Sequence, residues 1–462
     1  MADTVLNLGS RRELFVDEFL MATRRDVQLK LHRPERREVA LTFDAPWEDN
    51  VAFPDRILHW GDGWRLYYRA AIQNLKDEEN SYVMAVAESR DGITFTRPEL
   101  GLVEFQGSRR NNILQIRGFP HVPPPFVDTN PAGRPDQRFK GLTGCAAKAV
   151  ALASADGLRW APMHEGALAL PGQFDTVNTG FWDSVAGCYR CYSRSWHDRE
   201  SRRVMKDWDF KGAKPVRAIQ HASSPDFIHW APPQQLEYAD GDYETQLYTN
   251  AILPCPGAEH VYLGFPNRFM ATRKPTTPRP HDGINDALFM SSRDGVRWDR
   301  WRDAWVRPGP DPLNWTDRNN YPSWGIAETS PTEWTMYITE HYRHDHVPTR
   351  LRRLAVRPWG FVSAHADLGG GELVTRPFTF AGATLRLNAA TSAAGSVQVE
   401  VQDKQGHALP DFALADMAPW YGDSVDAPMA WRGGGDLAAL AGQPIRLRFV
   451  LSDADVYALR FA

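Results

Sequence analysis

The chain alternates short apolar and aromatic runs with clusters of turn-forming residues. Residues 64–69 (WRLYYR) and 334–339 (WTMYIT) are typical of these runs, because β-branched and aromatic side chains favour strands. Apolar positions with the 3.6-residue period of an amphipathic helix are rare along the chain. The pattern predicts an all-β protein with many tight turns, in which helix is a minor component.

One turn recurs along the chain. Its aspartate can accept hydrogen bonds from downstream amides, its glycine adopts positive φ, and an aromatic side chain closes the hairpin. The closing aromatics follow one another at 65, 70 and 68 residues, and a weaker fifth copy ends at Trp359, 61 residues later. Units of this length around hairpins predict the five blades of a β-propeller. The four copies are residues 89–95 (SRDGITF), 154–160 (SADGLRW), 224–230 (SPDFIHW) and 292–298 (SRDGVRW).

A second recurrence lies ahead of each hairpin, where the innermost strand of a blade should begin. In every unit an asparagine follows an acid within a few residues. Innermost strands line the central channel, so we expect these side chains to form a ring of carboxylates and amides at one mouth. The preference of Asn and Asp for turns before strands is the alternative explanation of each single pair. The pairs are Asp49 with Asn50, Asp128 with Asn130, Asp175 with Asn178, Glu244 with Asn250, and Asp317 with Asn320.

The sequence pattern changes after Trp359, where the recurrent turn no longer occurs. A glycine-rich linker at residues 364–371 is followed by alternating runs at 384–387, 396–401 and 445–450. Alternation with a period of two indicates an antiparallel β-sandwich. We therefore expect a five-bladed propeller over residues 1–365 that carries the catalytic site, and a β-sandwich over residues 366–462 that supplies no catalytic acid.

Composition removes several classes of function. The 462 residues are 42% apolar and 24% charged, which is ordinary for a folded globular protein. A net charge of −4 disfavours nucleic acid as a partner. No apolar stretch is long enough for a membrane helix, and the start of the chain lacks the pattern of a secretion signal. The four cysteines are too few for a disulfide scaffold in a chain of this length.

The repeated Ser-x-Asp-x-x-x-Trp turn, the five predicted blades and the trailing sandwich together resemble the β-fructosidase and arabinanase superfamily of glycoside hydrolases. Segments 14–18 (LFVDE), 45–48 (APWE), 128–131 (DTNP), 264–266 (GFP) and 371–374 (GELV) are similar to an uncharacterised bacterial glycoside hydrolase-like group. The Trp-x-Asn-Asp-Pro-Asn-Gly signature of invertases is absent, as are clean Arg-Asp-Pro and Glu-Cys motifs. Only the positions of functional residues can therefore be transferred.

In that superfamily, three acids from the first three blades project into the funnel. The resemblance implies Asp49, Asp128 and Asp175 as their nearest equivalents, with Glu244 as a further candidate for the acid. Cleavage of a glycosidic bond needs one protonated and one ionised carboxyl group, which a mouth crowded with carboxylates can supply. The remaining candidates would bind substrate through hydroxyl groups, a carboxylate or sugar rings: Glu48, Asn50, Asn130, Asn178, Arg194, Tyr248, Asn250, Arg268, Asp317, Arg318, Asn320 and Trp324.

These residues predict a glycoside hydrolase that acts on an oligo- or polysaccharide without a cofactor. The alternatives are a non-catalytic carbohydrate-binding propeller and a phosphorylase of the same fold, for which Arg268 and Arg318 could bind phosphate. Two further clusters could hold a metal. Cys188 and Cys191 have C-x-x-C spacing but lie in a predicted strand, and the histidines at 341, 344 and 346 follow a strand end, where a loop at the rim is the simpler interpretation.

Overall fold

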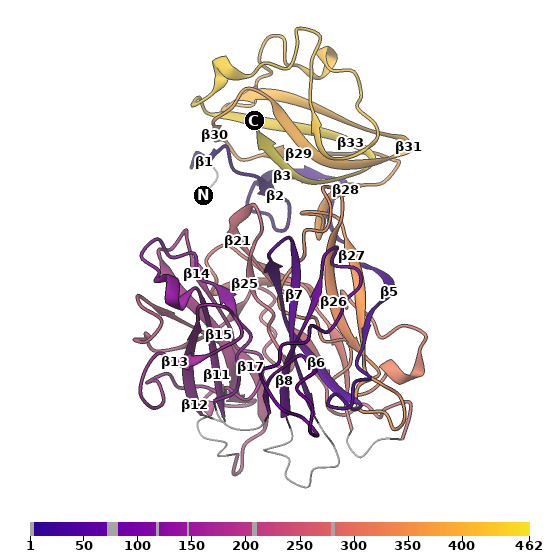
Figure 1. Ribbon diagram of the computed structural model, residues 1–462. Coiled ribbons are helices and arrows are strands. Elements are labelled where there is room, and N and C mark those ends of the chain that lie inside the picture. The colour runs from indigo at the N-terminus through magenta and orange to yellow at the C-terminus, as the bar shows by residue number, and fades with distance from the viewer. Residues whose placement is uncertain (1–3, 72–81, 117–119, 146, 206–209, 279–281) are drawn as a thin grey trace.

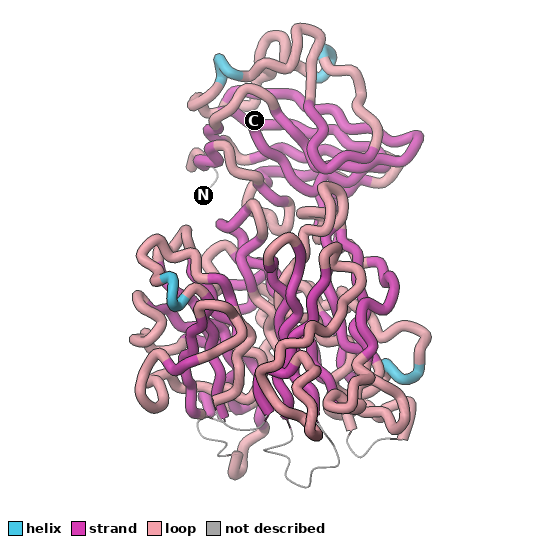
Figure 2. The backbone as a smooth tube through the Cα atoms, viewed as in Figure 1, coloured by secondary structure: helices cyan, strands magenta, loops and turns pink. Residues whose placement is uncertain are grey.

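The computed structural model describes residues 4–71, 82–116, 120–145, 147–205, 210–278 and 282–462. Figure 1 shows a larger body of strands arranged around an axis and a smaller body at one end of it. Strands and loops account for nearly all of the described chain (Figure 2), and its helical segments are single 3-10 turns at Pro135–Gln137, Pro312–Asn314, Leu414–Asp416 and Ala438–Leu440. The all-β prediction is confirmed. No helix in the described ranges is long and apolar enough to cross a membrane.

The larger body is a five-bladed β-propeller, as the turn spacing predicts. Blades I to IV follow one another along the chain, each with its innermost strand first. Blade I contains β6 (Val51–Trp60), β7 (Gly63–Ala71), β8 (Tyr82–Ser89) and β9 (Ile113–Ile116); blade II contains β10 (Phe126–Val127), β11 (Phe139–Cys145), β12 (Lys148–Ser154) and β13 (Ala161–Pro162). Blade III contains β14 (Thr179–Asp183), β15 (Cys188–Asp198), β17 (Pro215–Ser224) and β18 (Gln234–Gln235), with β16 (Val204–Met205) beside β15.

Blade IV contains β20 (Leu253–Cys255), β21 (Ala258–Gly264), β24 (Met290–Ser292) and β25 (Arg297–Arg300), with β19 (Glu237–Tyr238) at its edge. A separate hairpin, β22 (Asn267–Met270) and β23 (Ile284–Ala287), extends from it. Blade V combines β26 (Trp334–Glu340) and β27 (Arg350–Val356) with β5 (Glu35–Thr42) from the start of the chain. Bridges from Pro322 and Ala327 to β26 add its innermost segment. Strand β5 therefore closes the ring, because it joins the first part of the propeller to the last.

The recurrent turn has one geometry in all four copies. The serine hydroxyl accepts a hydrogen bond of 2.9 Å from the backbone N–H three residues later, whether that residue is glycine or Phe227. That residue has φ between 69° and 78°, a range that favours glycine. Each turn follows the third strand of its blade, so Trp160, Trp230 and Trp298 occupy equivalent positions.

Tyrosines join three of these four turns to the preceding blade. The Tyr67 hydroxyl donates a 3.0 Å hydrogen bond to the carbonyl of Gly157 in the next blade, and Tyr192 does the same to Gly295. Tyr337 of blade V donates to the turn carbonyl of blade I. These three tyrosines are at most 1% exposed. Each hydroxyl therefore stabilises a boundary between two blades at a buried position.

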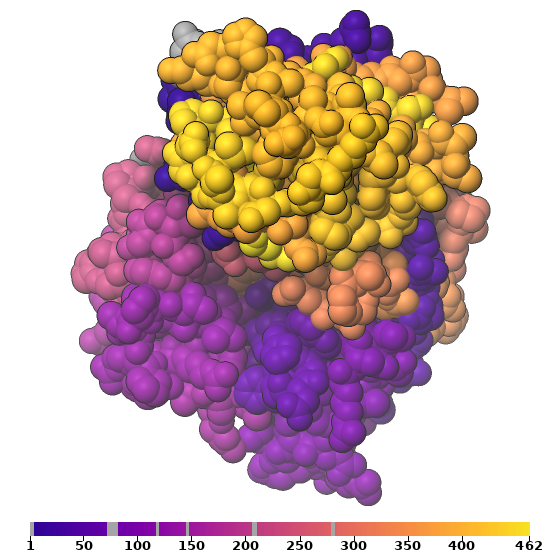
Figure 3. All heavy atoms as spheres, turned by 90° about the horizontal axis from the view of Figure 1, so that it is seen from above, coloured from indigo at the N-terminus to yellow at the C-terminus, as the bar shows by residue number. Residues whose placement is uncertain are grey.

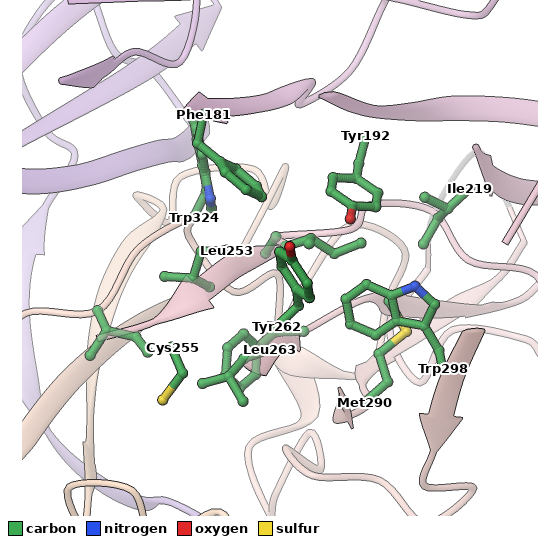
Figure 4. Close-up of a cluster of buried hydrophobic side chains, with 14 of the residues drawn as sticks. Phe181, Tyr192, Ile219, Leu253, Cys255, Tyr262, Leu263, Met290, Trp298 and Trp324 are labelled. Carbon is green, nitrogen blue, oxygen red and sulfur yellow. The ribbon is translucent and has the colours of Figure 1, made fainter. Parts of the chain in front are cut away.

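Large side chains fill the space between the blades. Figure 4 shows Trp298 and Met290 of blade IV close to Tyr192 of blade III, with Tyr262 and Leu263 beside them. Tyr192 and Trp298 meet edge to face with their ring centroids 6.1 Å apart. The ring of blades is thus held by packing of buried aromatic side chains as well as by β5.

The smaller body is one ten-stranded sheet folded around its own core, consistent with the predicted sandwich. Its long strands, β31 and β33, pair along most of their length. The first strands of the chain also belong to this sheet, so the second domain draws on both ends of the sequence, whereas the sequence pattern indicated residues 366–462 alone. Its strands are β1 (Leu6–Gly9), β2 (Glu13–Leu14), β3 (Met21–Arg25), β4 (Gln28–Leu31), β28 (Val362–Ala366), β29 (Gly371–Thr375), β30 (Phe378–Phe380), β31 (Leu385–Asp403), β32 (Asp423–Pro428) and β33 (Ile445–Phe461).

Arginines join the two domains. Arg293, in the blade IV turn, pairs with Asp17 at 2.8 Å and also with Glu13. The guanidinium of Arg12 lies 3.9 Å from the ring centroid of Trp359. Arg357 pairs with Asp423 of the second domain, so this acid lies in the contact between the domains.

Candidate active site at the far mouth

The propeller axis has two ends with different side chains. Inner strands of neighbouring blades run in the same direction, as the parallel bridge between Arg56 and Trp324 shows. Residues that precede the inner strands therefore gather at one end, and residues that follow them gather at the other. The second domain lies at the end where the inner strands finish and covers part of it (Figures 1 and 3). We call the opposite end, where the inner strands begin, the far mouth.

The end that faces the second domain contains a hollow of about 990 Å³. Acidic and aromatic side chains line it, among them Glu259, Glu328 and Trp182. Burial, and then the charge of Glu259, raises the pKa of Glu328. Trp324, a predicted substrate-binding residue, lines this hollow, but its side chain is 1% exposed and the Arg56 guanidinium lies 4.2 Å from its ring centroid. Trp324 therefore offers little ring surface to a ligand.

Aromatic rings from several blades meet at the far mouth. The ring centroid of Tyr248, ahead of blade IV, is 5.4 Å from that of Tyr321 in blade V. Phe53 of blade I lies 5.8 Å from Tyr321 and 4.6 Å from Tyr342. Tyr321 and Tyr342 are buried, whereas Tyr248 and Phe53 are partly exposed. The partly exposed rings give this end flat apolar surface next to the axis.

Arginines surround these rings. The guanidinium carbon of Arg194 lies 4.5 Å from the ring centroid of Tyr248, and Arg217 lies 5.2 Å from the same ring. Arg318 donates a 3.2 Å hydrogen bond to the Tyr342 hydroxyl. Burial by itself raises the pKa of Tyr248, but Arg194, Arg318 and Arg217 outweigh it, and the pKa lies below its ordinary value. The far mouth thus combines arginines with aromatic rings.

Among the predicted acids, Asp175 best combines exposure to solvent with a fixed position at the far mouth. It precedes β14, its side chain is 38% exposed, and Arg194 holds it at 3.1 Å. Arg194 is itself 3% exposed and also donates to the Tyr248 carbonyl, so its position is fixed by two elements. Asp175 therefore combines exposure to solvent with a fixed orientation beside Tyr248.

Three other predicted acids precede inner strands but differ in exposure. Asp49 is partly exposed, has a φ of 47°, and accepts a hydrogen bond from the next backbone N–H. Asp317 is buried, 3.5 Å from Arg318. Glu244 is half exposed and pairs with Arg199 at 2.8 Å. Asp317 and Glu244 each have an arginine partner, whereas the sequence analysis expected carboxylates crowded together.

Glu48 and Asp128 each lie in a buried ion pair. Glu48 is fully buried, pairs with Arg97 at 2.6 Å and accepts a hydrogen bond from Tyr68. Asp128 follows β10 instead of preceding it, and pairs with Lys140 at 2.7 Å. Because the neighbouring Thr129 lines the hollow under the second domain, Asp128 lies toward that end and does not join the acids of the far mouth.

The predicted asparagine ring links blades through the backbone. Asn50, Asn250 and Asn320 donate to carbonyl groups of a neighbouring blade at 2.8 to 3.2 Å, and Asn178 donates to carbonyls of its own loop. These amides are at most 7% exposed. Asn130 donates to the Tyr189 hydroxyl near Asp128. The amides satisfy buried backbone carbonyl groups, most of them at the blade boundaries. The recurring asparagines therefore stabilise the propeller.

The remaining candidate residues are Arg268, the histidine cluster and the two cysteines. Arg268 of β22 pairs with Asp286 of β23. His341 pairs with Asp311 at 2.6 Å, and His344 hydrogen-bonds to the Leu313 carbonyl at 2.9 Å. Within the described ranges no three His, Cys, Asp or Glu side chains are grouped so that they could hold a metal. Cys188 and Cys191 are free, and only Cys191 is buried, as their places on a strand predict.

Three contributors to the far mouth were missed in the sequence. Arg217, Tyr342 and Phe53 belong to the cluster described above, and none of them belongs to a repeated motif. Arg217 lies near the start of β17, where its side chain contacts Trp196, Tyr248 and Phe269. The polar residues that alternate along β17 gave no indication of these contacts, which form between residues far apart in sequence.

No family model matches the chain, and no curated protein matches it. Among solved structures, it is similar to a glycosyl hydrolase from Bacteroides ovatus at 14% identity, over 76% of this chain and 94% of that one, with a TM-score of 0.40. It is also similar to the catalytic domain of the Coprinopsis cinerea GH62 alpha-L-arabinofuranosidase, at 12% identity over 70% and 97% of the two chains, with a TM-score of 0.44. A beta-1,2-mannobiose phosphorylase from Listeria innocua is 12% identical over 71% and 97%, with a TM-score of 0.39.

Proposed function

We propose that the protein is a carbohydrate-active enzyme that cleaves a glycosidic bond at the far mouth. The observation that carries this proposal is Asp175, a solvent-accessible carboxylate fixed by buried Arg194 beside the partly exposed ring of Tyr248. Sugar rings pack well on flat aromatic faces, and glycosidic cleavage requires positioned carboxyl groups. Asp175 and Tyr248 supply one carboxyl group and one aromatic face at the same end of the propeller, which supports the proposal.

Asp175 is proposed as the carboxylate that attacks the anomeric carbon or activates a water molecule. Its partner, which protonates the leaving oxygen, is proposed among Asp49, Glu244 and Asp317, since these acids also precede inner strands. A carboxyl separation of about 5 to 5.5 Å in the complex would give retention of configuration, and about 6.5 to 9.5 Å would give inversion. Asp128 is proposed as a structural residue because its ion pair is buried.

The test is cleavage of a panel of furanoside and pyranoside oligosaccharides by the wild type and by single amide variants. Asp175→Asn keeps the shape of the side chain and removes its charge, so turnover of the best substrate should fall by about 10² to 10⁴-fold with folding intact. Asp136→Asn, on a side chain that is 61% exposed in a blade II loop, is the matched control and should leave turnover unchanged.

The same panel identifies the acid partner. One of Asp49→Asn, Glu244→Gln and Asp317→Asn should reduce turnover to a similar extent. Retained turnover in Asp175→Asn would refute the assignment of the site. Binding of glycans without cleavage by the wild type would refute the enzymatic proposal and favour a carbohydrate-binding propeller.

A further inference from the structure

Arg217 is a partly buried cation with no acidic partner in the described part of the chain. Its guanidinium carbon lies 4.6, 4.9 and 5.2 Å from the ring centroids of Trp196, Phe269 and Tyr248. Its hydrogen bond goes to the neutral side chain of Gln246, at 2.6 Å, and its Nε is buried without a hydrogen-bond partner. Burial, and then the charge of Arg194, lowers the pKa of Arg217. The protein holds this cation without a direct ion pair among the described residues, and the charge of Asp175 offsets only part of the cost of its burial.

Several other buried arginines of the propeller are paired with acids, whereas Arg56 donates to the carbonyls of Pro125 and Trp324. Arg69 holds Asp55 through two hydrogen bonds of 2.8 and 2.9 Å, and Arg300 pairs with Asp240 at 3.0 Å. These pairs follow the general rule that a charge removed from water is compensated by its opposite. Arg217 departs from that rule at the end of the channel where the candidate acid lies. Its missing partner is therefore expected to come from outside the described residues.

Two neighbouring arginines strengthen the positive potential. Asp175 offsets Arg194, and Asp317 lies 3.5 Å from Arg318, which leaves the charge of Arg217 in excess. The Nε of Arg194 is also buried without a hydrogen-bond partner, although this side chain is only 3% exposed. Planar guanidinium groups with free N–H donors match the geometry of carboxylate and phosphate oxygens.

We propose that Arg217, together with Arg194 and Arg318, binds an anionic group at the far mouth when substrate is present. This inference rests on the proposed cleavage site, and it names the class of substrate. The anion is either a carboxylate carried by an acidic sugar or an inorganic phosphate that enters beside the sugar. Both supply oxygen atoms that the guanidinium groups can hold, and they differ in what turnover requires. An acidic sugar makes the enzyme selective for charged glycans, whereas phosphate makes turnover depend on phosphate concentration.

Calorimetric titration of the wild-type protein with galacturonate, inorganic phosphate and neutral galactose tests the inference. One of the two anions should bind saturably and more tightly than galactose. Arg217→Met keeps the apolar stem in its aromatic surroundings and removes the charge, so the dissociation constant for that anion should rise at least about tenfold. Arg159→Met removes a positive charge from a side chain that is 71% exposed in the blade II turn, and it should not change the dissociation constant.

Arg318→Met provides a second variant, on a side chain 29% exposed, in case Arg217→Met does not fold, and it should also weaken binding of the anion. Equal binding of galactose and both anions by the wild type would overturn the inference. Unchanged anion binding in the variants would overturn it as well. Cleavage of an acidic glycan, or phosphate-dependent cleavage, at the wild-type rate by Arg217→Met would contradict this inference alone, whereas absence of all cleavage by the wild type would contradict the proposed function.

Discussion

Asp128 and Asp175 should respond in opposite ways to the same chemical change. The Asp128 side chain is 2% exposed, and it accepts hydrogen bonds from Lys140 at 2.7 Å and Tyr189 at 2.9 Å. Asp128→Asn leaves the buried ammonium of Lys140 without a counterion. Breaking a buried pair in this way costs about 3 to 5 kcal/mol of folding free energy. Asp175→Asn also removes the counterion of buried Arg194, but the acid of this pair is 38% exposed, so the cost should be smaller, at about 1 to 3 kcal/mol.

The assay measures both quantities on the same preparations. Denaturant midpoints followed by intrinsic fluorescence report stability, and kcat/KM on the best glycan of the panel reports activity. Asp128→Asn should lower the midpoint clearly and leave kcat/KM of the folded fraction within a few-fold of wild type. Asp175→Asn should lower the midpoint less than Asp128→Asn does, and it should lose activity by orders of magnitude. The reasoning is refuted if Asp128→Asn is as stable as wild type but inactive, or if Asp175→Asn is active.

Two further predictions concern the architecture. Tyr337→Phe removes the hydrogen-bond donor to the buried turn carbonyl of Gly92 and should cost about 1 to 3 kcal/mol of folding free energy. Tyr67→Phe should cost less, about 0.5 to 1.5 kcal/mol, because Trp160 Nε1 also donates to the Gly157 carbonyl, at 3.2 Å; equal shifts of the denaturation midpoint in the two variants would contradict this difference. Burial raises the pKa of Asp455, but hydrogen bonds from His32 and Ser363 outweigh it and hold the pKa well below its usual range. The ionised Asp455 therefore contributes fully to stability above its unfolded pKa of about 3.9, and this contribution is lost as pH falls through the folded pKa. Asp455→Asn should be less stable than wild type at pH 7 and should lose less stability on acidification. Parallel profiles of stability against pH for variant and wild type would contradict this role of Asp455.

The blades could be predicted from the sequence because their turns depend on local chemistry. A serine, an aspartate and a residue with positive φ form the same hydrogen bonds wherever they occur in this order, so their spacing counts the blades. The pairing of β1 to β4 with strands from the other end of the chain has no local signal. The extent of the second domain therefore could not be read from composition or alternation.

The candidate site was predictable only in part. Whether an acid precedes or follows its inner strand depends on a boundary of one or two residues, and β10 is only two residues long, so Asp128 could not be assigned to an end. The recurring asparagines were recognised, but their carbonyl partners lie in neighbouring blades, as for Asn50 and His344. Arg217 was missed because its aromatic neighbours come from distant segments. Motifs identified repeated positions, and the fold determined what each position contacts.

The central claim is that glycan binds where the inner strands begin. The most direct test is a crystal structure of Asp175→Asn soaked with the oligosaccharide that the wild type cleaves best, because this variant should bind substrate without turning it over. We predict sugar at the far mouth, with one ring against Tyr248 and the scissile oxygen within reach of residue 175. Sugar bound only in the hollow beneath the second domain, beside Glu259 and Glu328, would contradict the account.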